Sequence, residues 1–203
     1  MSRVAIIDYG LCNLDSILRA VEVCGGTPSL ARTPDELAGC ERIILPGVGS
    51  FARAMENLRV AGFADALPNI VEKNGIPLLG ICLGMQLLAQ TGSEGGESDG
   101  LGLLHGQVQR LVPTRGERVP HIGWNDVTLP APSPLFDGIE PETDFYFVHS
   151  YRLESPAEEI LATVDYCGTT VAAAGRGHVM AVQFHPEKSQ DDGFRLLGNF
   201  LAY

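Results

Sequence analysis

Two short segments carry side chains that could do covalent chemistry. In the first, Gly80-Ile81-Cys82-Leu83-Gly84, an apolar run ends in a cysteine between two glycines, and an apolar helical pattern follows. This is the pattern of a nucleophile elbow with cysteine in place of serine. Such a turn places the Cys82 thiol at a helix N-terminus, where the helix dipole favours the thiolate. The backbone N–H of Leu83 would then face the oxyanion formed when Cys82 attacks a carbonyl.

The second segment is Gln183-Phe184-His185-Pro186-Glu187, at the end of a strand pattern. Residues two apart on an extended chain project to the same side, and Pro186 restricts the backbone, so we expect Glu187 to orient the His185 imidazole. With Cys82, this supplies a nucleophile, a general acid–base and an orienting carboxylate. A buried structural cysteine and a strand-end histidine beside a solvated glutamate are the alternatives. The two segments together favour the catalytic interpretation.

Alternating apolar strands and amphipathic helices must position these segments. The patterns predict strands at 3–9, 27–30, 42–45 and 76–81, and helices that begin at 14 and 33 and cover 51–59 and 63–74. This alternation predicts a flavodoxin-like, mostly parallel twisted α/β sheet with helices on both faces. Functional sites in such sheets lie outside the carboxyl ends of the strands, where loops 10–13 and 46–50 and Cys82 all fall.

The second half of the chain has a different texture. A polar, glycine-rich loop at 91–100 precedes short strand patterns near 106–111, 144–148, 160–164, 171–174 and 179–184, and a final helix is expected at 193–201. No internal repeat or long linker divides the sequence. We therefore expect one domain over residues 1–203.

Composition excludes several classes of function. With 14 basic and 25 acidic residues the net charge is −11, which repels nucleic-acid backbones. No apolar run approaches the ~20 residues of a membrane helix, and the N-terminus has no signal-peptide layout, so we expect a cytoplasmic protein that binds no membrane. The five cysteines show no CxxC pair or zinc-ligand spacing. We expect free thiols, no metal site and no cofactor.

The segments 80–86 and 183–187 together resemble the signatures of the class I, triad-type glutamine amidotransferases, and the likeness spans most of the chain. Further segments resemble the glutaminase subunits of imidazole glycerol phosphate synthases within that class. These are Asp8-Tyr9-Gly10 with Asn13-Leu14, and the stretches 46–51, 121–125 and 147–151. The resemblance implies the single-domain class I amidotransferase fold, in which short antiparallel strands supplement the parallel sheet.

The resemblance also implies the roles of individual residues. Cys82 would attack the carboxamide of glutamine, His185 would protonate the departing ammonia and then activate water, and Glu187 would hold the imidazole. The N–H groups of Leu83 and, after a peptide rearrangement in 46–49, of Val48 would bind the oxyanion. Family members are thought to keep this second donor misaligned until the partner is loaded. The positions matching glutamine-binding residues are Gly49, Gln86, Glu94, Ser150 and Tyr151.

A glutaminase of this kind must deliver ammonia to an acceptor on another chain. The resemblance implies a heterodimer with a (β/α)₈-barrel cyclase, which receives the ammonia and forms imidazole glycerol phosphate and an aminoimidazole carboxamide ribotide in histidine biosynthesis. The positions matching the face toward that barrel are Asn13, Trp124, Asn125, Tyr146 and Lys188. Cys12 departs from the family, which usually has glycine there.

Two other interpretations remain open at this stage. Another free-standing class I glutaminase, such as the one serving pyridoxal phosphate synthesis, would share the triad but would lack the segments at 121–125 and 147–151. A non-enzymatic sensor of the same fold would use the elbow cysteine and would not need His185 and Glu187.

Overall fold

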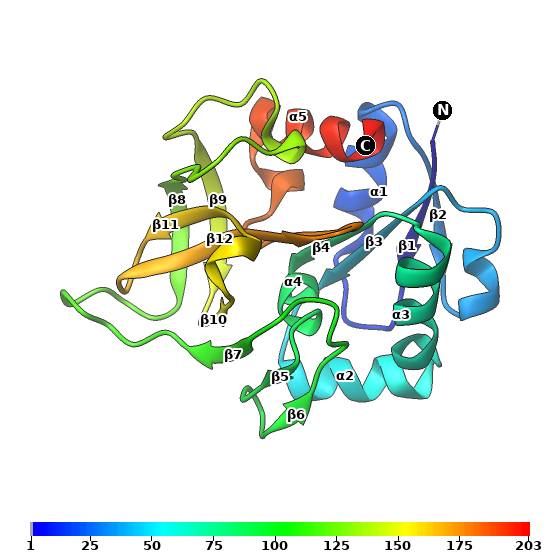
Figure 1. Ribbon diagram of the computed structural model, residues 1–203, viewed down its shortest axis with the longest axis horizontal. Helices are drawn as coiled ribbons and strands as arrows, with labels where there is room; N and C mark the ends of the chain where they lie inside the picture. Colours follow the sequence, from blue (N-terminus) through cyan, green and yellow to red (C-terminus); the bar gives the residue numbers. More distant parts are fainter. Residues whose placement is uncertain (1) are drawn as a thin grey trace.

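The structure is organised around a seven-stranded sheet whose middle strands carry Cys82 and lead to His185. In the computed structural model, which describes residues 2–203, the strand order is β11-β12-β13-β4-β3-β1-β2 (Figure 1). The parallel strands are β1 (Arg3–Ile7), β2 (Thr27–Ala31), β3 (Arg42–Gly47), β4 (Leu78–Cys82) and β13 (Val179–Val182). β12 (Thr169–Arg176) runs antiparallel to both β13 and β11 (Ile160–Asp165).

Both faces of this sheet are buried, because successive side chains of each strand point to opposite sides. Val4 and Ile6 of β1 belong to one core, and Ala5 and Ile7 to the other. The first core is covered by α1 (Leu14–Val23) and α5 (Gln190–Ala202). The second is covered by α2 (Phe51–Val60), α3 (Phe63–Asn74) and α4 (Leu83–Leu87), as Figure 1 shows.

Shorter strands extend the molecule beyond the sheet. β5 (Thr91–Gly92), β6 (Ser98–Asp99), β7 (Gln107–Arg110) and β10 (Tyr151–Glu154) form a four-stranded sheet in the order β10-β7-β5-β6. β8 (His121–Asp126) and β9 (Asp144–His149) form an antiparallel ribbon. Phe145 and Phe147 of β9 are fully buried in the same core as α5, which fixes the ribbon against the central sheet.

The predicted fold class is confirmed, and the elements expected from apolar patterning are present with small shifts at their ends. The helix after Cys82 is short, since α4 ends at Leu87. Three features were not predicted: the strands β8 and β10, and the pair β5 and β6 inside the polar loop. In the described residues 2–203, no helix is long and apolar enough to cross a membrane.

Strand register brings the predicted chemical residues to one edge. Gly47 of β3 pairs with Cys82, and Val182 of β13 pairs with Ile81, so both neighbouring strands end beside the cysteine. Because parallel strands place their carboxyl ends together, the segments that begin at Val48 and at Gln183 leave the sheet on either side of Cys82.

The elbow itself requires both of its glycines. Cys82 has φ 55° and ψ −112°, a conformation that most residues avoid, and the chain then turns at once into α4. A Cβ on Gly80 would lie 2.8 Å from the Leu88 side chain and 2.9 Å from the Gly84 backbone. A Cβ on Gly84 would overlap the backbone carbonyl of Leu45 on β3. Glycine is therefore dictated by close backbone approach.

We predict that Gly84→Ala destabilises the fold by about 3 kcal/mol or more, because β3 must shift to admit the new methyl group. The matched control is Gly198→Ala in α5, where a Cβ meets nothing within 4 Å and alanine should stabilise the helix by about 0.5–1 kcal/mol. Urea unfolding of both variants measures the effect. Equal midpoints for Gly84→Ala and the unsubstituted chain would contradict this account of the elbow.

Candidate active site

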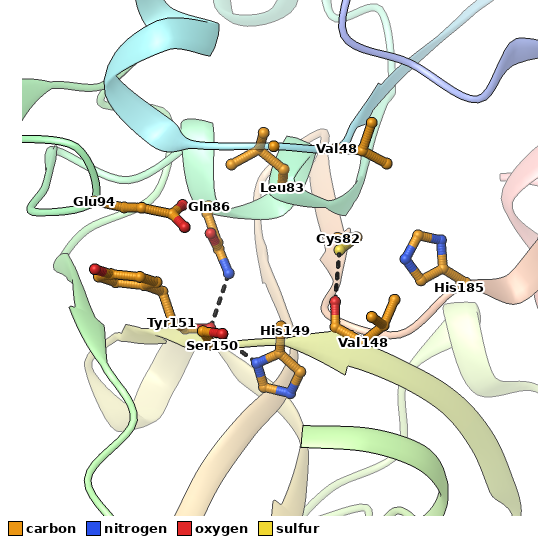
Figure 2. A pocket seen from close by; sticks show the side chains of 11 residues that line it. Val48, Cys82, Leu83, Gln86, Glu94, Val148, His149, Ser150, Tyr151 and His185 are labelled. Atoms are coloured by element: carbon orange, nitrogen blue, oxygen red, sulfur yellow. Dashed lines mark hydrogen bonds between the residues drawn. The ribbon is translucent and has the colours of Figure 1, made fainter. Parts of the chain in front are cut away.

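A cavity of about 190 Å³ opens at the carboxyl edge of the sheet, next to the elbow. It gathers segments that lie far apart in the sequence, as Figure 2 shows. The lining residues are Val48, Gly49, Cys82, Leu83, Gln86, Glu94, Val148, His149, Ser150, Tyr151 and His185. All the residues that the sequence associates with the nucleophile, the oxyanion and glutamine are in this set. Val148 and His149 were not predicted.

The Cys82 thiol is buried in the base of this cavity, with 7% of the residue exposed. Its sulfur lies 3.7 Å from the carbonyl oxygen of Val148 and 3.8 Å from the side-chain nitrogen of Gln183. The positive φ of Cys82 costs about 1–3 kcal/mol, which the paired strands on both sides of β4 must offset. Strain of this kind holds the sulfur toward the cavity instead of into the sheet.

The pairing of His185 with Glu187 was predicted, and the two side chains are hydrogen bonded. Nδ1 of His185 lies 2.8 Å from Oε1 of Glu187, and both side chains are almost completely buried. The predicted reason was wrong, because the segment is not extended. β13 ends at Val182, and a 3₁₀ helix begins at Pro186, so a tight turn brings the carboxylate back to the ring.

The free edge of the imidazole is available for proton transfer. Nε2 of His185 is buried and has no hydrogen-bond partner among residues 2–203 that the distance and angle criteria accept. The ring lies next to Cys82 in Figure 2. Burial by itself would lower the pKa of His185, but hydrogen bonds and charge interactions with Cys82 and Glu187 outweigh it and raise the pKa to about 9. The ring is therefore protonated near pH 7.

One of the two predicted oxyanion donors is occupied by another group. The N–H of Val48 donates to the carbonyl oxygen of Leu11 at 2.9 Å. That peptide must reorient before this N–H can serve the cavity. The N–H of Leu83 belongs to the first residue of α4, where helix geometry provides no intrahelical acceptor. The next residue after Val48, Gly49, has φ +101° and open space around its Cβ position.

A network of amides crosses the floor of the cavity. The side-chain nitrogen of Gln86 donates to the carbonyl of Tyr151 and to Oε1 of Gln183, at 2.9 Å in each case. Glu94 approaches from the polar loop, and its carboxylate accepts the N–H of Phe51 at the start of α2 at 3.2 Å. Burial raises the pKa of Glu94. Gln183 belongs to the second motif, which predicted no role for it, since its fully buried side chain is evident only in three dimensions.

Three of the five predicted partner-facing residues form one surface cluster, which we call the aromatic cluster: Trp124, Tyr146 and Lys188. Trp124 is 48% exposed and meets Tyr146 edge to face, with ring centroids 5.9 Å apart. Nζ of Lys188 lies 6.0 Å from the Tyr146 ring. Asn125 is half-buried one residue beyond Trp124, and Asn13 precedes α1 without capping it through its side chain.

Cys12 packs into the first loop. Its sulfur lies 3.6 Å from the carbonyl oxygen of Ile7 and 3.7 Å from that of Pro46, so the thiol fills the space between two strand ends. Burial raises its pKa to about 11. Cys12 therefore stays a neutral thiol at physiological pH. It and the other four cysteines are all free in the structure.

Comparisons with known proteins agree with this geometry. Residues 5–202 match the family model described as Glutamine amidotransferase class-I. The chain is 47% identical to imidazole glycerol phosphate synthase subunit HisH of Moorella thermoacetica, covering 98% of this chain and 94% of that one. It is 42% identical to HisH 1 of Campylobacter jejuni strain RM1221, covering 98% of both.

Solved structures share the fold at lower sequence identity. The structure of PurLQS from Thermotoga maritima superposes with a TM-score of 0.77 at 21% identity, covering 100% of this chain and 98% of that one. A putative GMP synthase protein from Thermoplasma acidophilum gives a TM-score of 0.75 at 18% identity, covering 100% of this chain and 93% of that one.

We predict that Glu187→Gln lowers the pKa of His185 by about one to two pH units, because a charged hydrogen bond is lost. A raised histidine pKa stabilises the fold fully below pH 6.5 and loses this contribution as the pH rises through about 9, so the variant should lose stability mainly at neutral and lower pH. Histidine ¹⁵N NMR titration and urea unfolding from pH 6 to 10 measure both effects. The control is Glu158→Gln, an exposed glutamate. An unchanged His185 titration in Glu187→Gln would refute the pairing.

Proposed function

The chain belongs to the class I glutamine amidotransferases, and within them to the HisH subunits of imidazole glycerol phosphate synthase, and from this premise we propose how its residues produce and deliver ammonia. The observation that carries the proposal is the convergence at one cavity of Cys82 from β4 and His185 from the end of β13. Glu187 lies behind the histidine, bonded to its far nitrogen. This is the order required for nucleophilic acyl transfer.

In the first half-reaction, the Cys82 thiolate attacks the side-chain carbonyl carbon of glutamine. A C–S bond forms, and the carbonyl oxygen takes up the negative charge. Nε2–H of His185 then protonates the nitrogen, the C–N bond breaks, and ammonia leaves a γ-glutamyl thioester. The raised pKa of His185 suits this step, because the ring carries the required proton at neutral pH.

In the second half-reaction, the now neutral His185 accepts a proton from water as the water oxygen attacks the thioester carbon. The C–S bond breaks, the Cys82 thiolate is regenerated and glutamate leaves. Glu187 keeps the imidazole in the orientation that serves both steps, since its carboxylate holds Nδ1.

Oxyanion stabilisation would control the rate. Leu83 offers one N–H, and the N–H of Val48 becomes the second donor only when its hydrogen bond to Leu11 is exchanged for one to the oxyanion. A single donor of this type is typically worth about 3 kcal/mol of barrier, or about 10²–10³ in rate. Resting activity is therefore low, and an event that reorients the Val48 peptide raises it.

The partner is a (β/α)₈-barrel cyclase that receives the ammonia. Lys188 of the aromatic cluster directly follows Glu187, so the cluster lies beside the site where ammonia forms. Trp124 and the 60% exposed Ile122 place apolar area on the outer face of the β8–β9 ribbon, as an interface anchor requires. Ammonia that passes into a docked barrel avoids protonation and dilution in water.

We predict that the chain alone releases glutamate slowly from glutamine and that a barrel cyclase loaded with its nucleotide ligand raises the rate by about 10²–10³. Cys82→Ala should abolish glutamate release with and without the cyclase. The Cys82→Ala complex should still support the cyclase when ammonium is supplied, which shows that assembly is intact.

The outcomes separate the competing functions. Stimulation by a pyridoxal phosphate synthase barrel, and none by the cyclase, would identify the other free-standing glutaminase. An absence of glutamate release under every condition would leave the non-enzymatic interpretation and refute the proposal.

A further inference from the structure

Two histidines that the mechanism does not use lie directly behind one wall of the cavity. His121 begins β8 and His149 ends β9, and the two residues are paired across the ribbon. Only 2% of His121 and 6% of His149 is exposed. His121 is stacked between Phe147 and Tyr166, with ring centroids at 4.7 and 3.7 Å. The rings therefore have little freedom to move.

The hydrogen bonds of this pair define which nitrogens carry protons. Nδ1 of His149 lies 2.8 Å from the carbonyl oxygen of Tyr151, which can only accept, so this nitrogen must be the donor. In a neutral ring Nε2 of His149 then accepts, and it lies 3.0 Å from Nδ1 of His121. Nδ1 of His121 is therefore protonated. Its Nε2 accepts in turn from the Asn125 side-chain amide at 3.4 Å.

Neutral rings are what this environment favours. Burial lowers the pKa of both histidines to about 4, and the charge of His185, the titratable group that faces His149 from β13, lowers the pKa of His149 further. The uncharged Phe147, Tyr166 and Asn125 surround His121. One directional set of hydrogen bonds therefore persists at physiological pH.

This set ends on a carbonyl that the cavity also uses. The oxygen of Tyr151 accepts from His149 and from Gln86, whose side chain also contacts Gln183 beside the Cys82 sulfur (Figure 2). Two donors from different elements thus fix the orientation of one peptide carbonyl. That peptide continues the segment Ser150–Tyr151, which lines the cavity next to the nucleophile.

We propose that His149, held in one tautomer by His121, is a positioning residue that fixes the Ser150–Tyr151 backbone for glutamine binding. The proposal rests on the proposed function, because it assigns this backbone to the substrate. His149 does not exchange protons with the substrate, since its Nδ1 proton is committed to Tyr151. Its contribution is to binding, and the glutamine ground state and transition state depend on it equally.

The kinetic test compares three variants in the complete complex with the loaded cyclase. His149→Leu should raise the KM for glutamine roughly fivefold or more while kcat changes little. His149→Asn, whose amide can still donate toward the Tyr151 carbonyl, should recover most of that loss. His178→Leu is the matched control, because this histidine is exposed in the turn before β13, and it should leave KM unchanged. An unchanged KM in His149→Leu, or no recovery in His149→Asn, would overturn the proposal.

A spectroscopic test does not depend on activity. In ¹⁵N-histidine NMR spectra of the full chain, His121 and His149 should both be neutral with the proton on Nδ1 from pH 8 down to about 5. A protonated ring in this range, or a proton on Nε2 of either residue, would overturn the assignment even if the enzyme is active. If the unsubstituted complex released no glutamate while the NMR result held, the proposed function would fail and the hydrogen-bonded pair would stand.

Discussion

The structure depends on one backbone constraint, the turn that joins β4 to α4 at Cys82. The cysteine is held at positive φ, and the turn fits only because Gly84 presses against the carbonyl of Leu45 and Gly80 against the helix. β4 can bear this strain because it is paired on both sides, to β3 and to β13. The same two pairings bring Val48 and His185 to the sulfur, so one geometry supplies the nucleophile, the oxyanion donor and the general acid.

Electrostatics and conformation then have separate tasks. The carboxylate of Glu187 keeps the buried imidazole protonated, which prepares the leaving-group step in the resting chain. The N–H of Val48 is instead bonded to Leu11, a residue of the loop that follows β1. A partner that contacts this loop or the nearby ribbon could shift that bond without touching the triad. Acid–base readiness and oxyanion stabilisation are thus controlled by different parts of the fold.

The sequence predicted the parallel core because its strands are continuous apolar runs and its helices have clear periodicity. It predicted the cavity residues because they lie in short motifs at strand ends. β8 and β10 were missed since their side chains alternate weakly and their pairing is long-range. The two buried histidines were visible in the segments 121–125 and 147–151, but nothing in those segments reveals that the rings meet across a ribbon. The 3₁₀ turn at Pro186 was hidden for a similar reason, because an extended segment would also pair His185 with Glu187.

The central claim is that Cys82 becomes acylated by glutamine. Acid quenching of the loaded complex during turnover, followed by peptide mapping by mass spectrometry, measures this directly. The account predicts a γ-glutamyl group on the peptide that contains Cys82 and none on the peptides of Cys12, Cys24, Cys40 or Cys167. Glutamate release with no acylated peptide, or with the acyl group on another cysteine, would contradict it.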